Sequence, residues 1–236
     1  MHLQPSLLST LPVLASYAAQ CVAASSSAPL SFGQNYAVLN LDLINGVVAP
    51  LANTSEGRKW INSTATWIDA VHAQSPPPLS IYTRIYYSSP AAPELSPETP
   101  FYQVAASFGN LTETSPASEI YALFAPQTQN GGKDVVLRKS RYYAGDGNSL
   151  EEILRTRGVD TVILSGLRTS GVLLSTAYRL FDLDYFVYVI GDNTIQPDAP
   201  KVKETILEDI LPGLPVTVIT LQEALEALGN SGPARW

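Results

Sequence analysis

The sequence predicts an α/β fold in which a mainly parallel sheet is covered on both faces by helices. Short apolar runs with strand character alternate along the chain with segments of helical periodicity. Strands that alternate with helices of this length form parallel sheets with right-handed crossovers. The strand candidates are residues 36–42, 79–87, 134–138, 161–165, 185–190 and 216–220.

Helix starts and ends are marked by polar residues and by glycine. Ser149 and Thr220 are each followed three positions later by Glu, which is the pattern of a capping box. These residues precede the helical segments 150–157 and 221–228. Gly158 is expected to end the first of these helices, because glycine readily adopts the left-handed conformation found there.

Composition indicates one globular domain. The chain has 236 residues, of which 45% are hydrophobic, and this is enough for a sizeable core. Only 15% are charged, which suits a compact domain with an uncharged polar surface. The net charge of −7 and the lack of clustered Lys and Arg argue against nucleic acid and against an anionic membrane as partners.

Metal and thiol chemistry find little support in the residues available. The chain has one cysteine, Cys21, and two histidines, His2 and His72, and no His, Cys and carboxylate cluster has metal-ligand spacing. We therefore predict no metal and no cofactor, and a Ser-His-Asp triad is equally disfavoured. His72 is expected to be a surface residue or a residue at the end of a helix.

The N-terminal segment, residues 1–34, leaves two interpretations open. Residues 7–19 are apolar like the core of a signal peptide, but no Lys or Arg precedes them. The run is too short to cross a membrane, so it is either a cleaved signal or an N-terminal arm. The protein is accordingly either secreted or cytoplasmic. Sequons that fit secretion occur at Asn53, Asn62 and Asn110.

The predicted domain covers residues 35–228 and contains one irregular insertion. Residues 75–126 hold half of the chain's 18 prolines, so no single helix can occupy them. Long irregular segments of this kind in compact domains are usually functional or disordered. The aromatic residues here indicate that part of the segment packs as a lid that covers a functional site. The tail, residues 229–236, is expected to be disordered or loosely packed.

The strongest functional signal lies in residues 161–192. An apolar strand closed by Gly166 leads through Thr169 and Ser170 into a helix over residues 172–182, and a second apolar strand follows. The amides at the start of a helix lack intrahelical partners and lie at the positive end of the helix dipole. Such a turn at a strand end is therefore suited to binding an anion.

This segment resembles the nucleophile region of the isochorismatase-like cysteine hydrolases, which include the nicotinamidases. That region reads roughly G-V-A-T-N-V-C-V-L-x-T-A-x-x-A-x-x-L-G-Y in the family, and an ungapped match puts Val172 at the position of the catalytic Cys. The matching residues are Gly166, Thr169, Leu174, Thr176, Ala177, Leu183 and Tyr185.

Two further landmarks follow the family order. An apolar strand ends in Asp in the stretch AVLNLDLING, which supplies Asp42 and Asn45, and DVVLRKSRYYA puts Lys139 after a middle strand. The resemblance implies a three-layer α/β/α sandwich with a mainly parallel six-stranded sheet. It also implies a small-molecule substrate and, because family members commonly assemble, a homodimer or homotetramer.

The resemblance implies Asp42 and Lys139 as the catalytic pair. In relatives that carry the Cys, the Asp takes the thiol proton, the Lys stabilises charge and helix-start amides form the oxyanion hole. Here the amides of Val172 and Leu173 occupy that position and are expected to be free of intrahelical partners. Valine cannot attack a substrate, so the covalent route of the family is closed to this chain.

No neighbouring hydroxyl is expected to replace the missing thiol. Ser170 and Ser175 lie two and three positions from Val172, and a helix turns by about 100° per residue, so neither presents its oxygen in the same direction. Ser170 is interpreted instead as a turn or N-cap residue. Arginines can anchor a substrate carboxylate, although a surface charge is the alternative for each. The residues expected to bind substrate are Arg141, Tyr142, Tyr143, Arg168, Thr169 and Ser170.

Three functions remain open from the sequence. The first is a Cys-less isochorismatase-like hydrolase in which Asp42 and Lys139 perform acid–base chemistry on a small carboxylated or carbonyl-bearing molecule. The isochorismatases proper provide the model, since they cleave a vinyl ether with an Asp as general acid and without a covalent intermediate. The alternatives are a non-catalytic binding or interaction protein, and a specialised-metabolism enzyme that catalyses elimination or rearrangement.

Overall fold

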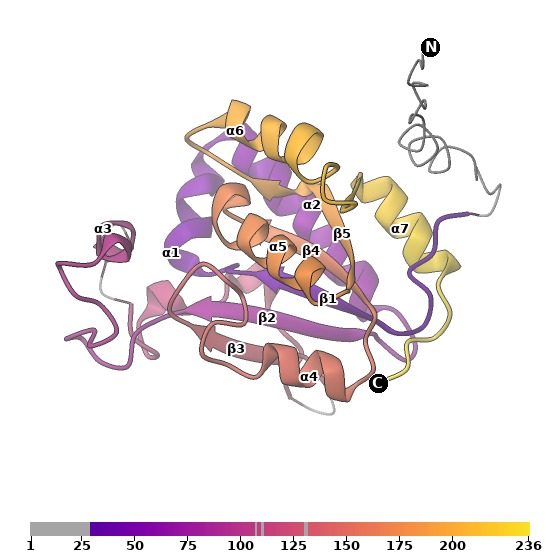
Figure 1. Cartoon of the computed structure of the whole chain (residues 1–236), viewed down its shortest axis with the longest axis horizontal. Helices are drawn as coiled ribbons and strands as arrows, with labels where there is room; N and C mark the ends of the chain where they lie inside the picture. Colours follow the sequence, from indigo (N-terminus) through magenta and orange to yellow (C-terminus); the bar gives the residue numbers. More distant parts are fainter. Residues whose placement is uncertain (1–28, 107, 110, 130–131) are drawn as a thin grey trace, which may run out of the picture.

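The structure is a computed structural model that describes residues 29–106, 108–109, 111–129 and 132–236 (Figure 1). The candidate signal segment, Cys21 and the sequon at Asn110 lie outside the described residues, whereas Asn53 and Asn62 are exposed. The helices of the described part are too short or too polar to cross a membrane.

A six-stranded parallel sheet forms the centre of the molecule, in the order β3-β2-β1-β4-β5-β6. Its strands are β1 (Tyr36–Leu41), β2 (Leu79–Ile85), β3 (Val135–Lys139), β4 (Thr161–Leu167), β5 (Phe186–Ile195) and β6 (Thr217–Ile219). The α-helices are α1 (Asn45–Val48), α2 (Ser55–His72), α3 (Pro100–Ala106), α4 (Leu150–Thr156), α5 (Leu174–Asp182), α6 (Pro200–Thr205) and α7 (Leu221–Asn230). Shorter 3-10 and π-helical turns are η1 (Ala49–Asn53), η2 (Pro116–Ser118), η3 (Ala122–Phe124), η4 (Thr169–Leu173) and η5 (Ile206–Ile210).

Helices cover both faces of the sheet, so the predicted α/β architecture is confirmed (Figure 1). On one face α2 and α7 pack against β5, and Trp67 and Ala224 belong to a core cluster that also contains residues of β1, β2 and β4. On the other face α4, α5 and η5 pack through Leu154, Ala177 and Ile206. Because strands buried on both faces read as continuous apolar runs, the six strands were visible in the sequence.

Polar and glycine signals at helix ends are borne out in two cases out of three. Gly158 ends α4 with φ of +64°, and the amides of Gly158 and Val159 donate to the carbonyls of Arg155 and Leu154 in a Schellman motif. Thr220 forms the predicted capping box with α7. The Ser149 side chain makes no capping hydrogen bond. The Leu150 amide instead donates to Oδ1 of Asn148 at 2.9 Å.

Several boundaries at the carboxyl ends of the strands differ from the expected ones. β4 and β5 extend past the predicted ends at residues 165 and 190, because their pairing resumes after an irregularity, with Gly166 opposite Thr194 and Leu167 opposite Ile195. The predicted helix over 172–182 begins with the wider turn η4. The helix α6, which begins at Pro200 as its first helical residue, had no counterpart in the predicted elements.

The Pro-rich insertion packs on the sheet edge where β1 and β2 end. Its residues Ala105 and Leu111 form a small core cluster with Ile44, Ile85 and Tyr87. The Tyr87 amide donates to the Leu111 carbonyl at 2.8 Å. The segment therefore stands beside the carboxyl ends of the strands, as a lid would (Figure 1).

The tail is ordered by contacts, so the expectation of a loosely packed end is wrong. The indole N–H of Trp236 donates to the Pro77 carbonyl at 2.9 Å, and the side chains of Lys133 and Arg157 lie over its ring. The Arg235 amide donates to the Gln34 carbonyl. Sequence composition at a chain end does not reveal that an aromatic terminal residue finds a partner in the core.

Two helix starts with the same sequence pattern provide a test of the fold. Thr220→Ala should lower the free energy of unfolding by about 1 kcal/mol, because it removes the side-chain acceptor of α7. Ser149→Ala should change it by less than about 0.5 kcal/mol, because that hydroxyl caps nothing. Urea denaturation measures both, and equal losses would contradict the structure at α4.

Candidate active site

Four side chains from neighbouring elements meet at the carboxyl edge of the sheet. Asp42 follows β1, Thr83 lies near the end of β2, Lys139 ends β3 and Val172 lies in η4 after β4. Because all strands are parallel, their carboxyl ends share one edge, and ligands of open α/β sheets bind there.

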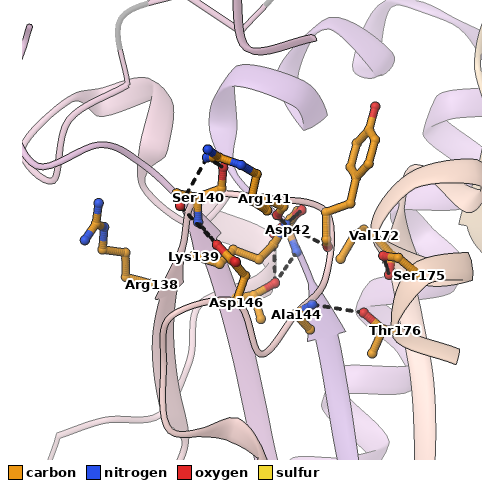
Figure 2. Close-up of polar contacts among 12 residues, drawn as sticks. Asp42, Arg138, Lys139, Ser140, Arg141, Ala144, Asp146, Val172, Ser175 and Thr176 are labelled. Atoms are coloured by element: carbon orange, nitrogen blue, oxygen red, sulfur yellow. Dashed lines mark hydrogen bonds and ion pairs between the residues drawn. The ribbon is translucent and has the colours of Figure 1, made fainter. Parts of the chain in front are cut away.

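The central contact is an ion pair between Asp42 and Lys139. Nζ of Lys139 lies 2.7 Å from Oδ2 of Asp42 (Figure 2). The ammonium also donates to the carbonyls of Arg141 at 2.8 Å and Tyr142 at 3.2 Å. An ammonium has three donors, so all of them are satisfied. Lys139 therefore fixes both the carboxylate and the loop that follows β3.

The other carboxylate oxygen is held by Thr83. The Thr83 hydroxyl donates to Oδ1 of Asp42 at 2.8 Å, and the Asp42 amide donates back to the same hydroxyl oxygen at 3.0 Å. Asp42 itself has a left-handed backbone with φ of +56°. These contacts fix the position of the carboxylate before any ligand arrives.

Burial decides the protonation behaviour of the pair. The Lys139 side chain has no exposed surface and that of Asp42 is 11% exposed. Burial raises the pKa of Asp42, and the Lys139 ammonium and Thr83 hydroxyl oppose this effect without cancelling it. Asp42 consequently holds a proton more readily than a solvated aspartate, which suits a general acid.

A small pocket opens beside this pair. Its free volume is about 30 Å³, which is room for roughly two waters and far below the volume of a typical metabolite site. The lining residues are Asp42, Val47, Ile85, Phe108, Lys139, Tyr142, Leu167, Arg168 and Val172. The pair and the Val172 position therefore border one space.

The turn before α5 is built around Gly166 and Val172. A Cβ at Gly166 would lie 2.1 Å from the Leu41 carbonyl oxygen, so only glycine fits beside β1. The Leu167–Arg168 peptide bond is cis. Val172 is 2% exposed. It lines the pocket and also belongs to the core cluster that contains Leu173 and Ala177.

The amides and hydroxyls of this turn differ in part from the expectation. The Leu173 amide donates to the Arg168 carbonyl at 3.4 Å, so the prediction of a free amide is wrong there. Ser170 is not the N-cap, because Arg168 holds that position. The amide and the hydroxyl of Ser170 both donate to Oε1 of Gln196. The Ser175 hydroxyl donates to the Val172 carbonyl at 3.2 Å (Figure 2).

Only some of the expected substrate-binding residues lie at the pocket. Tyr142 and Arg168 line it, although Arg168 also pairs with Asp198. The Tyr143 hydroxyl points instead to α4, where it donates to Glu151 at 2.8 Å. Thr169 is buried, and its hydroxyl is hydrogen-bonded to the hydroxyl of Thr194 at an oxygen–oxygen distance of 2.9 Å.

Arg141 is engaged by the insertion rather than by the pocket. Its guanidinium donates to the Glu94 carbonyl at 2.9 Å and lies 4.9 Å from the centre of the Phe101 ring. Phe101 in turn makes an edge contact with Tyr142, with ring centres 5.3 Å apart. The insertion therefore supports the pocket wall through Phe101 and contributes Phe108 to the lining directly.

One predicted position is confirmed and one residue was overlooked. His72 is the last residue of α2, as expected for a residue at a helix end, and its Nε2 lies 2.8 Å from Oδ2 of Asp134. Thr83 was overlooked, although it lies in a predicted strand next to that of Asp42. In the described part of the chain no group of three His, Cys or carboxylate side chains could hold a metal ion.

The fold and the site together define an α/β protein with a buried carboxylate–ammonium pair at the carboxyl edge of its sheet. The family model described as the isochorismatase domain matches residues 36–223. The chain belongs to this family of isochorismatase-like hydrolases.

Solved structures of the family have the same fold. An isochorismatase family protein from Burkholderia thailandensis is 24% identical, with a TM-score of 0.67 over 86% of this chain and 100% of that one. N-carbamoylsarcosine amidase from Thermoplasma acidophilum is 22% identical, with a TM-score of 0.62 over 80% and 97% of the two chains.

Curated relatives match over a shorter stretch. Ureidoacrylate amidohydrolase RutB from Methylorubrum extorquens is 34% identical over 90 residues, which is 38% of this chain and 36% of the relative. The matched part thus spans about a third of that relative's length.

Removing one member of the ion pair tests its structural weight. Lys139→Met should lower the free energy of unfolding by about 3–5 kcal/mol, because it leaves the Asp42 carboxylate buried without its cation. Arg138→Met, at a more exposed pair on the same strand, should cost about 1 kcal/mol or less. Urea denaturation at neutral pH compares them, and equal costs would contradict the assigned burial.

The loss should also depend on pH. Because the folded pKa of Asp42 is raised, its contribution to stability is greatest below the ordinary carboxyl pKa and falls as the pH rises through the folded pKa. In Lys139→Met the pKa of Asp42 should rise further, because the ammonium that lowers it is gone. The cost of Lys139→Met should therefore be smaller at about pH 5 than at about pH 8.

Proposed function

We propose that this protein is a hydrolase that acts without a cysteine nucleophile, through acid–base chemistry of Asp42 and Lys139. The substrate is a small molecule that carries a carboxylate or carbonyl group and an acid-labile bond, such as an enol ether. The observation that carries the proposal is the buried Asp42–Lys139 pair beside a pocket in which Val172 occupies the place of the family thiol.

The raised pKa of Asp42 supports its role as the acid. Protonated Asp42 gives its proton to the carbon of the enol ether, and water adds to the resulting cation. The proton released from that water returns to the Asp42 carboxylate, and the hemiketal breaks down to an alcohol and a ketone. Lys139 stabilises the carboxylate in the interval when its proton is on the substrate.

The names of the relatives suggest a second bond type that this site is poorly equipped to cleave. A ureidoacrylate amidohydrolase and an N-carbamoylsarcosine amidase act on carbamoyl amides. In the cysteine hydrolases such bonds are attacked by a thiol, and a valine side chain offers no nucleophile. The site of this chain therefore favours acid-labile bonds over amides.

Substrate binding requires the pocket to open. The free space of about 30 Å³ is too small for any metabolite. Most of its wall is formed by strand ends and by the turn after β4. Tyr142 and Phe108 lie outside regular elements, so their side chains are the ones expected to move outward when the substrate enters.

Turnover of an enol ether provides the test. With isochorismate as substrate, Asp42→Asn should lower kcat/KM by about 10²–10⁴, because the general acid is lost. Iodoacetamide should leave the wild-type rate unchanged, because the chain's only thiol, Cys21, lies far in sequence from Asp42, Lys139 and Val172. Product formation is followed by liquid chromatography and mass spectrometry.

Val172→Cys is the complementary variant. It restores the family thiol beside Asp42, and it should gain iodoacetamide-sensitive release of ammonia from ureidoacrylate or N-carbamoylsarcosine, which the wild type should lack. Full activity of Asp42→Asn on isochorismate would overturn the proposed acid. If the wild type turns over neither class of compound, the non-catalytic alternative is favoured, which the small closed pocket and the valine also fit.

A further inference from the structure

An open groove separate from the active site lies between α2, the end of β5, α6 and the start of α7. Its volume is about 600 Å³, which falls within the range of small-molecule sites. It shares no lining residue with the active-site pocket. The groove is lined by Glu56, Lys59, Trp60, Asn62, Ser63, Thr66, Asp192, Thr194, Ile195, Lys203, Leu221, Gln222 and Leu225.

The cations of this groove lack partners. Within the described part of the chain neither Lys59 nor Lys203 forms an ion pair. Lys203 is half-buried, and burial lowers its pKa while Asp192 and Glu56 raise it and Lys59 lowers it further. Asp192 and Glu56 thus act on the ammonium of Lys203 from a distance, but neither forms an ion pair with it, so its N–H donors can bind a ligand carboxylate.

The acidic residues of the groove are placed at helix starts. Asp192 accepts a hydrogen bond from the Leu221 amide at 2.8 Å and so caps α7. Glu56 lies in the first turn of α2, where the helix dipole favours a carboxylate. The two lysines therefore remain the groups available to an anionic ligand.

The walls of the groove add an apolar surface. Trp60, Leu221 and Leu225 supply it. The indole N–H of Trp60 is buried, so it is not a donor that a ligand in the groove reaches. The two ammonium groups are therefore the groups of the groove that suit ligand oxygens.

We propose that this groove is a second binding site, which takes a small organic carboxylate with an aromatic or aliphatic body. The carboxylate binds Lys203 and the apolar part lies against Trp60 and Leu225. The site is adjacent to the active-site turn, because Thr194 of its wall is hydrogen-bonded to Thr169 of η4. The groove and the active-site pocket share no lining residue, so the two can be occupied at the same time.

Benzoate serves as the probe, in saturation-transfer NMR titrations of the full chain. Wild type should show saturable binding, and Lys203→Met should weaken it tenfold or more. Lys203→Arg should keep the affinity within about threefold, since it retains the charge. Lys201→Met is the matched control on α6, because Lys201 is exposed and does not line the groove, and it should leave the affinity unchanged. Circular dichroism verifies that each variant is folded.

The neutral isostere benzamide separates the charge from the apolar contact, and it should bind at least tenfold more weakly than benzoate. Absence of saturable benzoate binding to the wild type would overturn the proposal. So would equal affinities of wild type and folded Lys203→Met. Tighter benzoate binding in Asp42→Asn would also overturn it, because that result would locate the probe in the active-site pocket, whatever the outcome of the hydrolase assays.

Discussion

The buried ion pair between Asp42 and Lys139 is the interaction on which the rest of the site depends. It joins the ends of β1 and β3 across β2, whose Thr83 holds the second carboxylate oxygen. The same ammonium fixes the carbonyls of Arg141 and Tyr142. The pair therefore positions the proposed acid, Asp42, and also the loop that supplies Tyr142 to the pocket wall.

The chemistry follows from how burial and charge are balanced at this pair. A carboxylate beside a lysine would ordinarily be more acidic than a free one, but here burial outweighs the ammonium and raises the pKa. In the proposed reaction the proton of Asp42 is the reagent, because Val172 stands where the family resemblance places the thiol. The pocket beside the pair has room for only about two waters.

Much of this site was predictable, because parallel strands end at one edge and apolar strands are visible in a sequence. Asp42 and Lys139 were identified on that basis together with the family resemblance. Which of two adjacent tyrosines faces the pocket was not predictable, because it depends on how Lys139 holds the loop: Tyr142 lines the pocket and Tyr143 reaches Glu151. Thr83 gave no signal, since a threonine in a strand is ordinary.

The proposed chemistry requires Asp42 to hold its proton more tightly than a free aspartate despite its contact with Lys139. A ¹³C NMR titration of the aspartate carboxyl groups, with the Asp42 signal assigned by its absence in Asp42→Asn, measures this directly. We expect a midpoint above the ordinary aspartate value of about 3.9, and a still higher one in Lys139→Met. A midpoint at or below about 3.9 in the wild type would contradict it, because the ammonium would then outweigh burial and Asp42 would not retain its proton as an acid.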